Sequence, residues 1–291
     1  MFMVALLALI AGCKNSSTVQ QNKSTDDQSL GFDKTEDMKD IYYRFPSPDE
    51  MLSIIDNNKL SFNDRIILPI ESSSRYLDSK SQSLNLGVYI ADMAYIMLFQ
   101  RQKEAISYFQ VVYGLSDKLR MSSAFDPALV KRFENNLDNR DSLRALSDEA
   151  MNDITDYLVQ NDKERTFAVI SIGGFIESLY LAFNVAGPYS ENNPLIQRIS
   201  DQKLVLNNLM DYAVQFASDE NVSDAIKILH PIRAVYSELL TKSGETKVQK
   251  LPDGKIVVSG GEKITISQEQ YNKLRDVTFN ARKLITENLE N

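Results

Sequence analysis

The sequence predicts a mainly α-helical fold of antiparallel helical hairpins, arranged as a bundle or as a repeat array, with a small β-meander near the C-terminus. Apolar residues recur at helical spacing through most of the chain after residue 39, and these segments begin and end at recognisable capping residues. Residues 246–266 instead carry short β-branched runs between turn residues. We therefore expect one domain over residues 39–291.

Capping residues mark where the predicted helices begin and end. Ser47 stands before Pro48 and three residues before Glu50, which is typical of a helix N-terminus. Gly187 followed by Pro188 predicts a helix end, because glycine permits the closing turn and proline cannot continue the helix. The predicted helices cover residues 48–57, 81–101, 104–119, 127–136, 141–159, 165–185, 194–217, 222–240 and 267–289. The buried stripe expected within residues 104–119 is Ala105, Phe109, Val112 and Leu119.

The β-rich segment contains three short runs, residues 246–250, 255–259 and 263–266. A Pro-Asp-Gly turn and a Gly-Gly pair separate them, which predicts a three-stranded meander. A hairpin is marginally stable on its own in water. We therefore expect the meander to pack on a helix through Ile256, Val258, Ile264 and Ile266.

Two predicted helices, residues 81–101 and 165–185, are apolar on nearly all sides and are expected at the centre of the domain. Gly87, Gly173 and Gly174 lie inside them, although glycine costs about 1 kcal/mol relative to alanine in a helix. This predicts a close crossing of the two backbones. The stretches LGVYIA and IGGFIE around these glycines also resemble each other, so an internal duplication stays open as an alternative.

Two carboxylates interrupt the apolar helices, Asp92 in the first and Glu177 in the second. Burial raises a carboxyl pKa, and two acids with different pKa values can serve as general acid and base in glycoside hydrolysis. The favoured interpretation is structural: each carboxylate accepts hydrogen bonds from tyrosines or pairs with an arginine or lysine. If a pocket lies between these helices, the expected lining residues are Asp92, Glu177, Tyr89, Tyr95, Phe175 and Tyr180.

Several chemistries lack the residues they need. His230 is the only histidine and precedes Pro231, which predicts a packed imidazole at a helix kink, and no second histidine or free cysteine completes a zinc site. No glycine-rich phosphate loop is present, so we expect neither a metal nor a cofactor. Ser200 and Lys203 fit the Ser-x-x-Lys pattern of penicillin-recognising enzymes, but helix follows them instead of an α/β region.

The N-terminus resembles the export signal of a bacterial lipoprotein. An apolar run ends in Ile-Ala-Gly followed by Cys13, the only cysteine, and the run is too short to span a bilayer. Residues 1–12 are therefore expected to be a signal peptide and Cys13 to carry lipid. No basic residue precedes the run, which indicates a translation start further upstream. Lys14, without an acidic cluster after it, favours the outer membrane facing the periplasm.

Charge and composition limit the partners. Residues 13–38 are polar and aperiodic, which predicts a disordered tether behind the lipidated cysteine. The formal net charge of −8 argues against nucleic acid and anionic membrane surfaces, which need clustered lysine and arginine. The expected partners are the membrane, through the lipid anchor, and a protein of the cell envelope. The oligomeric state stays open.

Three stretches resemble helical lipoproteins of Bacteroidota: LGVYIADMAYIMLFQRQKEAISYF, DNRDSLRALSDEAMNDITDYLVQNDKERTFAVISIGGFIESLYLA and NPLIQRISDQKLVLNNLM. The resemblance covers most of residues 40–240. It implies an all-α fold in the cell envelope and implies no activity and no catalytic residues. The helical hairpins of tetratricopeptide repeats are a looser analogy, since the Trp, Ala and Pro positions of that repeat are not all present.

The expected function is therefore a membrane-anchored envelope lipoprotein that serves as a non-enzymatic binding or scaffold module. Helical arrays present long grooves, and the residues for catalysis are few. Two alternatives stay open. One is a small-molecule or glycan binder with a pocket between the central helices, and the other is a hydrolase that uses Asp92 and Glu177.

Overall fold

The computed structural model describes residues 61–287, apart from much of 125–159 and the stretches 243–246, 251–255 and 260–262. All described residues belong to the unit Asp33–Asn291. The expected signal peptide, tether and helix at 48–57 lie outside the described residues, as do most of the predicted helices between 127 and 159.

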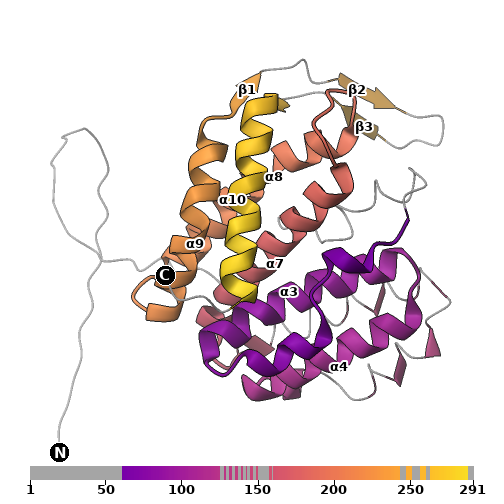
Figure 1. Ribbon diagram of the computed structural model, residues 1–291, viewed down its shortest axis with the longest axis vertical. Coiled ribbons are helices and arrows are strands. Elements are labelled where there is room, and N and C mark those ends of the chain that lie inside the picture. Colours follow the sequence, from indigo (N-terminus) through magenta and orange to yellow (C-terminus); the bar gives the residue numbers. More distant parts are fainter. Residues whose placement is uncertain are drawn as a thin grey trace, which may run out of the picture. The chain divides into compact units, whose positions relative to one another are not determined.

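The predicted mainly α-helical class is confirmed (Figure 1). The observed ends of the described long helices differ from the predicted ones by three residues or fewer, and capping residues mark the starts of α3, α8, α9 and α10 and the end of α7. The long helices are α3 (Ser79–Leu98), α4 (Gln102–Lys118), α7 (Glu164–Ala186), α8 (Pro194–Val214), α9 (Glu220–Ser237) and α10 (Gln268–Thr286).

Side-chain caps satisfy the free N–H groups at several helix starts. Ser267 and Gln270 form a capping box at the start of α10. Gly187 ends α7 with φ of 68°, a left-handed conformation that glycine adopts without a Cβ clash. The other N-terminal caps are Asp78 for α3, Asn193 for α8 and Asp219 for α9.

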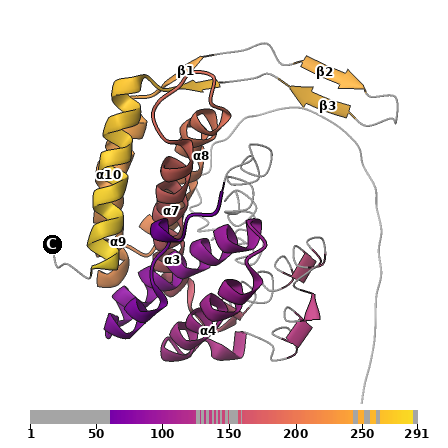
Figure 2. The same cartoon turned by 45° about the vertical axis from the view of Figure 1, so that its right-hand side comes forward.

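Helix α7 is the central element of the described part of the domain. It packs against α3, α8, α9 and α10, and α3 forms a hairpin with α4. After the strands, the chain returns through α10, which packs on both α9 and α7 (Figure 1, Figure 2). Because α10 returns to earlier helices, the described helices form a bundle and not an open array in which each hairpin contacts only its neighbours.

The length and apolar composition of α7 would suffice to cross a membrane, with a mean hydropathy of 1.6 over its most apolar window. However, 78% of that window is buried among the other helices. Glu177 on this helix is ion-paired with Arg282 of α10. We therefore interpret α7 as the core helix of a packed domain.

The expected close crossing of the two apolar helices is confirmed for α3 and α7. A Cβ added to Gly87 would lie 2.0 Å from the carbonyl oxygen of Ile170, and one added to Gly173 would lie 2.0 Å from that of Leu84. No side chain fits at either position. The two backbones are therefore in direct contact at these glycines.

The core stripe of α4 is close to the predicted one. Phe109 is only half-buried, and Tyr108 beside it is buried instead. Leu115 is buried as well and was not among the predicted residues. The predicted stripe residues that are buried are Ala105, Val112 and Leu119.

The expected small β element near the C-terminus is confirmed, but its strands form two separate two-stranded antiparallel sheets instead of one three-stranded meander. Strand β2 (Lys247–Lys250) pairs with β3 (Ile256–Ser259) as expected from the turn between them. Strand β4 (Lys263–Thr265) pairs instead with β1 (Leu240–Lys242), which the sequence places at the end of a helix. Local turn signals predict the hairpin but not this pairing, whose partners are more than twenty residues apart.

The two hairpin pairings do not share one register. On one side of the segment four residues separate β1 from β2, while on the other side three residues separate β3 from β4. The pairing of opposite residues therefore shifts by one residue between the two sheets. Ile264 and Ile266 are buried against the helices as predicted. The side chains of Ile256 and Val258 lie outside the described residues.

Substituting Gly173 with alanine is expected to force α3 and α7 apart, because the new methyl group overlaps the backbone of Leu84. We expect Gly173→Ala to lower the free energy of unfolding by about 1–3 kcal/mol or more. Gly114→Ala is the matched control: no atom lies within 4 Å of its added Cβ, so helix propensity alone should stabilise the protein by about 1 kcal/mol. Urea unfolding measures both variants, and equal effects would contradict the close crossing.

Candidate functional site

The two carboxylates predicted from the sequence meet in the core, together with an arginine that sequence reasoning missed. Asp92 of α3 and Glu177 of α7 have no exposed surface. Arg282 of α10 donates from Nε to Glu177 Oε2 at 3.0 Å and from Nη2 to Glu177 Oε1 at 3.3 Å. The guanidinium also lies over the ring of Tyr180, 4.3 Å from its centroid. We call Asp92, Glu177 and Arg282 the core ionic cluster.

The protonation of the cluster follows from its burial. Burial raises the pKa of the Asp92 carboxyl well above its ordinary value, and the neighbouring Glu177 carboxylate raises it further. Burial also raises the pKa of Glu177, but Arg282 and a hydrogen bond from Asp92 oppose that rise. We therefore infer that the pair shares one proton, which Asp92 holds and donates to Glu177, and that Arg282 balances the Glu177 charge.

Asp92 also fixes a segment that crosses the helices. Its Oδ2 accepts a hydrogen bond from the backbone N–H of Leu68 at 2.9 Å. Its Oδ1 is buried and has no N–H or hydroxyl donor among the described residues. A proton on Oδ1, directed at Glu177, satisfies this atom and agrees with the raised pKa of Asp92.

Tyrosines hold the same segment, residues 63–76, which we call the strap; it contains the short 3₁₀ helices η2 (Asp64–Ile66) and η3 (Ile70–Arg75). The hydroxyl of Tyr89 donates to Pro69 O at 2.8 Å, and that of Tyr108 donates to Leu68 O at 2.7 Å. The hydroxyl of Tyr95 accepts from Asn63 N at 3.2 Å. Burial raises the pKa of both Tyr89 and Tyr108, so these hydroxyls remain donors at neutral pH.

The end of the strap also meets the end of α10. The hydroxyl of Tyr76 donates to Thr286 O at 2.9 Å, and Asn85 Nδ2 donates to Ile285 O at 2.9 Å. These carbonyls belong to the last turn of the helix, where no intrahelical donor is available. Burial raises the pKa of Tyr76 to about 12, so this cap is stable at neutral pH.

The six predicted pocket residues are therefore parts of a packed core. Asp92 and Glu177 contact each other, Tyr180 packs under Arg282, and Tyr89 and Tyr95 hold the strap. Phe175 is buried in the hydrophobic core. Because neither carboxyl has exposed surface, a substrate does not reach them in this structure.

The remaining candidate residues have structural surroundings. His230 is exposed, so the predicted packed imidazole is wrong. Pro231 beside it is also exposed within α9, on the solvent side, where the lost backbone donor leaves no buried group unsatisfied.

The Ser200 hydroxyl donates to Ile196 O of its own helix, while the Lys203 ammonium donates to Leu239 O. No three metal-binding side chains converge within the described residues.

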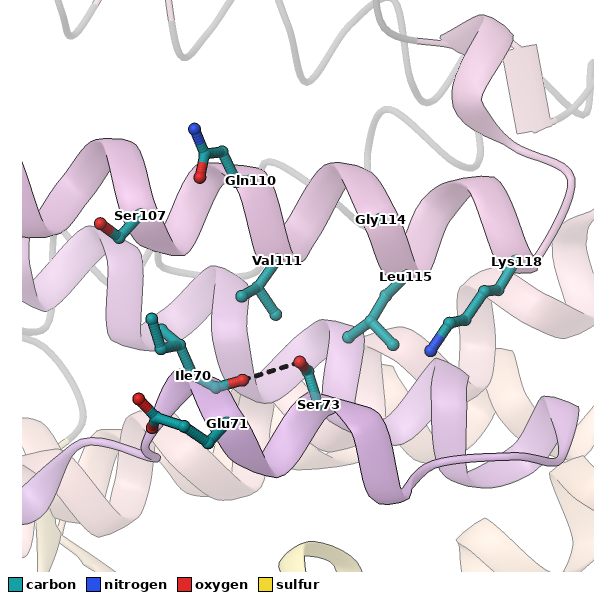
Figure 3. A pocket seen from close by; sticks show the side chains of 9 residues that line it. All are labelled: Ile70, Glu71, Ser73, Ser107, Gln110, Val111, Gly114, Leu115 and Lys118. Atoms are coloured by element: carbon teal, nitrogen blue, oxygen red, sulfur yellow. Dashed lines mark hydrogen bonds between the residues drawn. The ribbon is translucent and has the colours of Figure 1, made fainter.

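A surface groove lies between η3 and α4, and its lining does not include Asp92, Glu177 or Arg282 (Figure 3). Its volume is about 350 Å³, and it is open to solvent. Sequence reasoning missed this groove, because it forms between segments that carry no motif; a glycine within α4 was the available signal. The lining residues are Ile70, Glu71, Ser73, Ser107, Gln110, Val111, Gly114, Leu115 and Lys118.

The fold and these two features define the class as a helical-bundle protein with a sealed ionic cluster and an open groove. Comparisons of the chain with protein-family models, curated proteins and solved structures find no match. The resemblance to helical lipoproteins of Bacteroidota therefore stays a prediction.

Asp92→Asn tests the shared proton. The amide reproduces both hydrogen bonds, since its oxygen accepts from Leu68 and its nitrogen donates to Glu177. In the wild type, the Asp92 carboxyl of the folded protein keeps its proton, whereas in the unfolded protein it releases this proton above its ordinary pKa of 3.8. Wild-type stability should therefore fall as pH rises above that value, until Asp92 ionises in the fold. The variant should lack this fall and become the more stable protein at higher pH.

The measurement is urea unfolding at several pH values between about 4 and 8. Glu177→Gln is the comparison variant: it leaves Arg282 buried without its counter-charge and should cost about 3–5 kcal/mol at neutral pH. If Asp92→Asn and the wild type show the same pH dependence, Asp92 is ionised in the folded protein and the proton assignment is wrong.

Proposed function

We propose that this protein is a lipid-anchored protein of the cell envelope whose helical domain is a non-enzymatic binding module. The observation that carries the proposal is the contrast between the two candidate sites. The paired carboxylates have no exposed surface and are occupied by Arg282 and the strap. The groove between η3 and α4 is open and is lined by apolar and polar side chains.

The sequence around Cys13 supports a lipid anchor. The apolar run before Cys13 has the length and the small residues of a lipoprotein signal, and Lys14 favours the outer membrane facing the periplasm. A polar tether of about 25 residues would give the domain a reach of roughly 25–30 Å from its anchor. A module on such a tether searches for partners in the layer next to the membrane.

A binder of small molecules or glycans between the central helices is the second candidate. The buried polar atoms of Asp92 are the observation in its favour. A ligand in that position would first have to displace the strap and break the hydrogen bond between Leu68 N and Asp92 Oδ2. The open groove requires no such rearrangement, so we favour the first proposal.

Cys13→Ala tests the anchor. We expect the full-length protein to incorporate labelled palmitate and to sediment with membranes, and the variant to lose both properties because the acylated sulfur is absent. Tyr113→Phe, a conservative change within α4, serves as the control and should behave as the wild type. Membrane sedimentation of unlabelled Cys13→Ala would contradict lipid anchoring.

Site-specific photo-crosslinking tests the binding role. A photoreactive amino acid at Gln110, which lines the groove, is expected to yield a discrete protein adduct in intact cells. The same amino acid at Arg198, an exposed residue of α8 outside the groove lining, is the control and should not. Equal adducts at both positions, or none at Gln110, would count against a binding site in the groove.

A further inference from the structure

We propose that the groove between η3 and α4 binds an extended peptide segment of a partner protein. In this complex, an apolar side chain of the peptide contacts the groove floor, a basic side chain lies beside Glu71, and an acidic side chain lies beside Lys118. This inference rests on the proposed binding function and names the chemistry of the partner.

The dimensions of the groove favour an extended chain. Its lining follows α4 from Ser107 to Lys118, a length of about 16 Å at the helical rise per residue. An extended peptide covers this length with about five residues. The volume of about 350 Å³ is small, and the groove is open, so a compact ligand would leave much of its surface in water.

The floor of the groove is apolar. Val111 and Leu115 point from α4 towards η3, and Ile70 lies at one end (Figure 3). Leu115 is buried, while Ile70 and Val111 are half-buried and keep apolar surface in contact with solvent. An apolar peptide side chain laid on these residues would remove that surface from water.

Gly114 lines the groove without adding a side chain to it. A Cβ at this position would meet no atom within 4 Å, in contrast to Gly87 and Gly173, whose added Cβ atoms would overlap a facing backbone. Packing within the described residues therefore does not require a glycine at position 114, and an alanine there would stabilise the helix more than glycine does. A backbone that approaches α4 closely is a reason for a glycine here.

The two ends of the groove carry opposite charges. Glu71 lies at the end near Ile70, and Lys118 lies at the other end (Figure 3). Both are exposed, and neither forms an ion pair within the part of the chain that the structure describes. A peptide with a basic residue, an apolar centre and an acidic residue is complementary to this arrangement.

The experiment is selection from a random heptapeptide library with the full-length protein in detergent, followed by Kd measurements on selected peptides by fluorescence polarisation. We expect the wild type to select peptides in which a basic and an acidic residue flank an apolar centre. Gly114→Leu should weaken binding at least tenfold, because its side chain fills the groove, while the melting temperature stays at or above that of the wild type.

The charged ends are tested separately. Glu71→Gln should remove the selection for the basic residue and leave that for the acidic one, and Lys118→Met should do the reverse. Glu191→Gln, which removes an exposed charge outside the groove lining, is the matched control and should select as the wild type does. Unchanged binding by Gly114→Leu, or selection without these charges, would overturn the inference.

The outcomes separate this inference from the function on which it rests. A specific adduct at Gln110 in cells, together with no charge-dependent peptide selection, would leave the binding module in place and reject the extended peptide. Absence of both the adduct and the selection would reject both proposals.

Discussion

The direct contact of α3 and α7 at their glycines is the constraint on which the rest of the structure depends. Asp92 and Glu177 follow Gly87 and Gly173 by little more than one helical turn, so the crossing brings the two carboxyls together inside the core. Two acids in this position need a proton and a counter-charge. The proton on Asp92 and the guanidinium of Arg282 supply them.

The core ionic cluster joins four parts of the chain. Helix α3 contributes Asp92, which holds the strap through Leu68, while α7 contributes Glu177 and α10 contributes Arg282. Burying charges costs solvation free energy that their attraction offsets only partly, so the cluster is a weak source of stability. Its effect is on specificity: the polar groups are satisfied only when the strap, α3, α7 and α10 all occupy their native positions.

The sequence was sufficient for features that depend on local chemistry. Ser267, Pro194 and Gly187 mark helix ends through caps and backbone restrictions that act within a few residues. It was not sufficient for contacts between distant segments. Arg282 lies 105 residues after Glu177, and no local pattern distinguishes it from the other arginines. The pairing of β1 with β4 and the groove between η3 and α4 are long-range contacts of the same kind.

The strap would bear tension under the proposed lipid anchoring. Within the described residues, the strap lies at the N-terminal side of α3, and η3 of the same strap forms one wall of the groove. From its N-terminal end, the strap is held by hydrogen bonds to Tyr95, Asp92, Tyr108 and Tyr89, in that order. In the proposed complex, tension between the lipid anchor and a groove-bound partner would act on these hydrogen bonds, and breaking them would open one side of the groove.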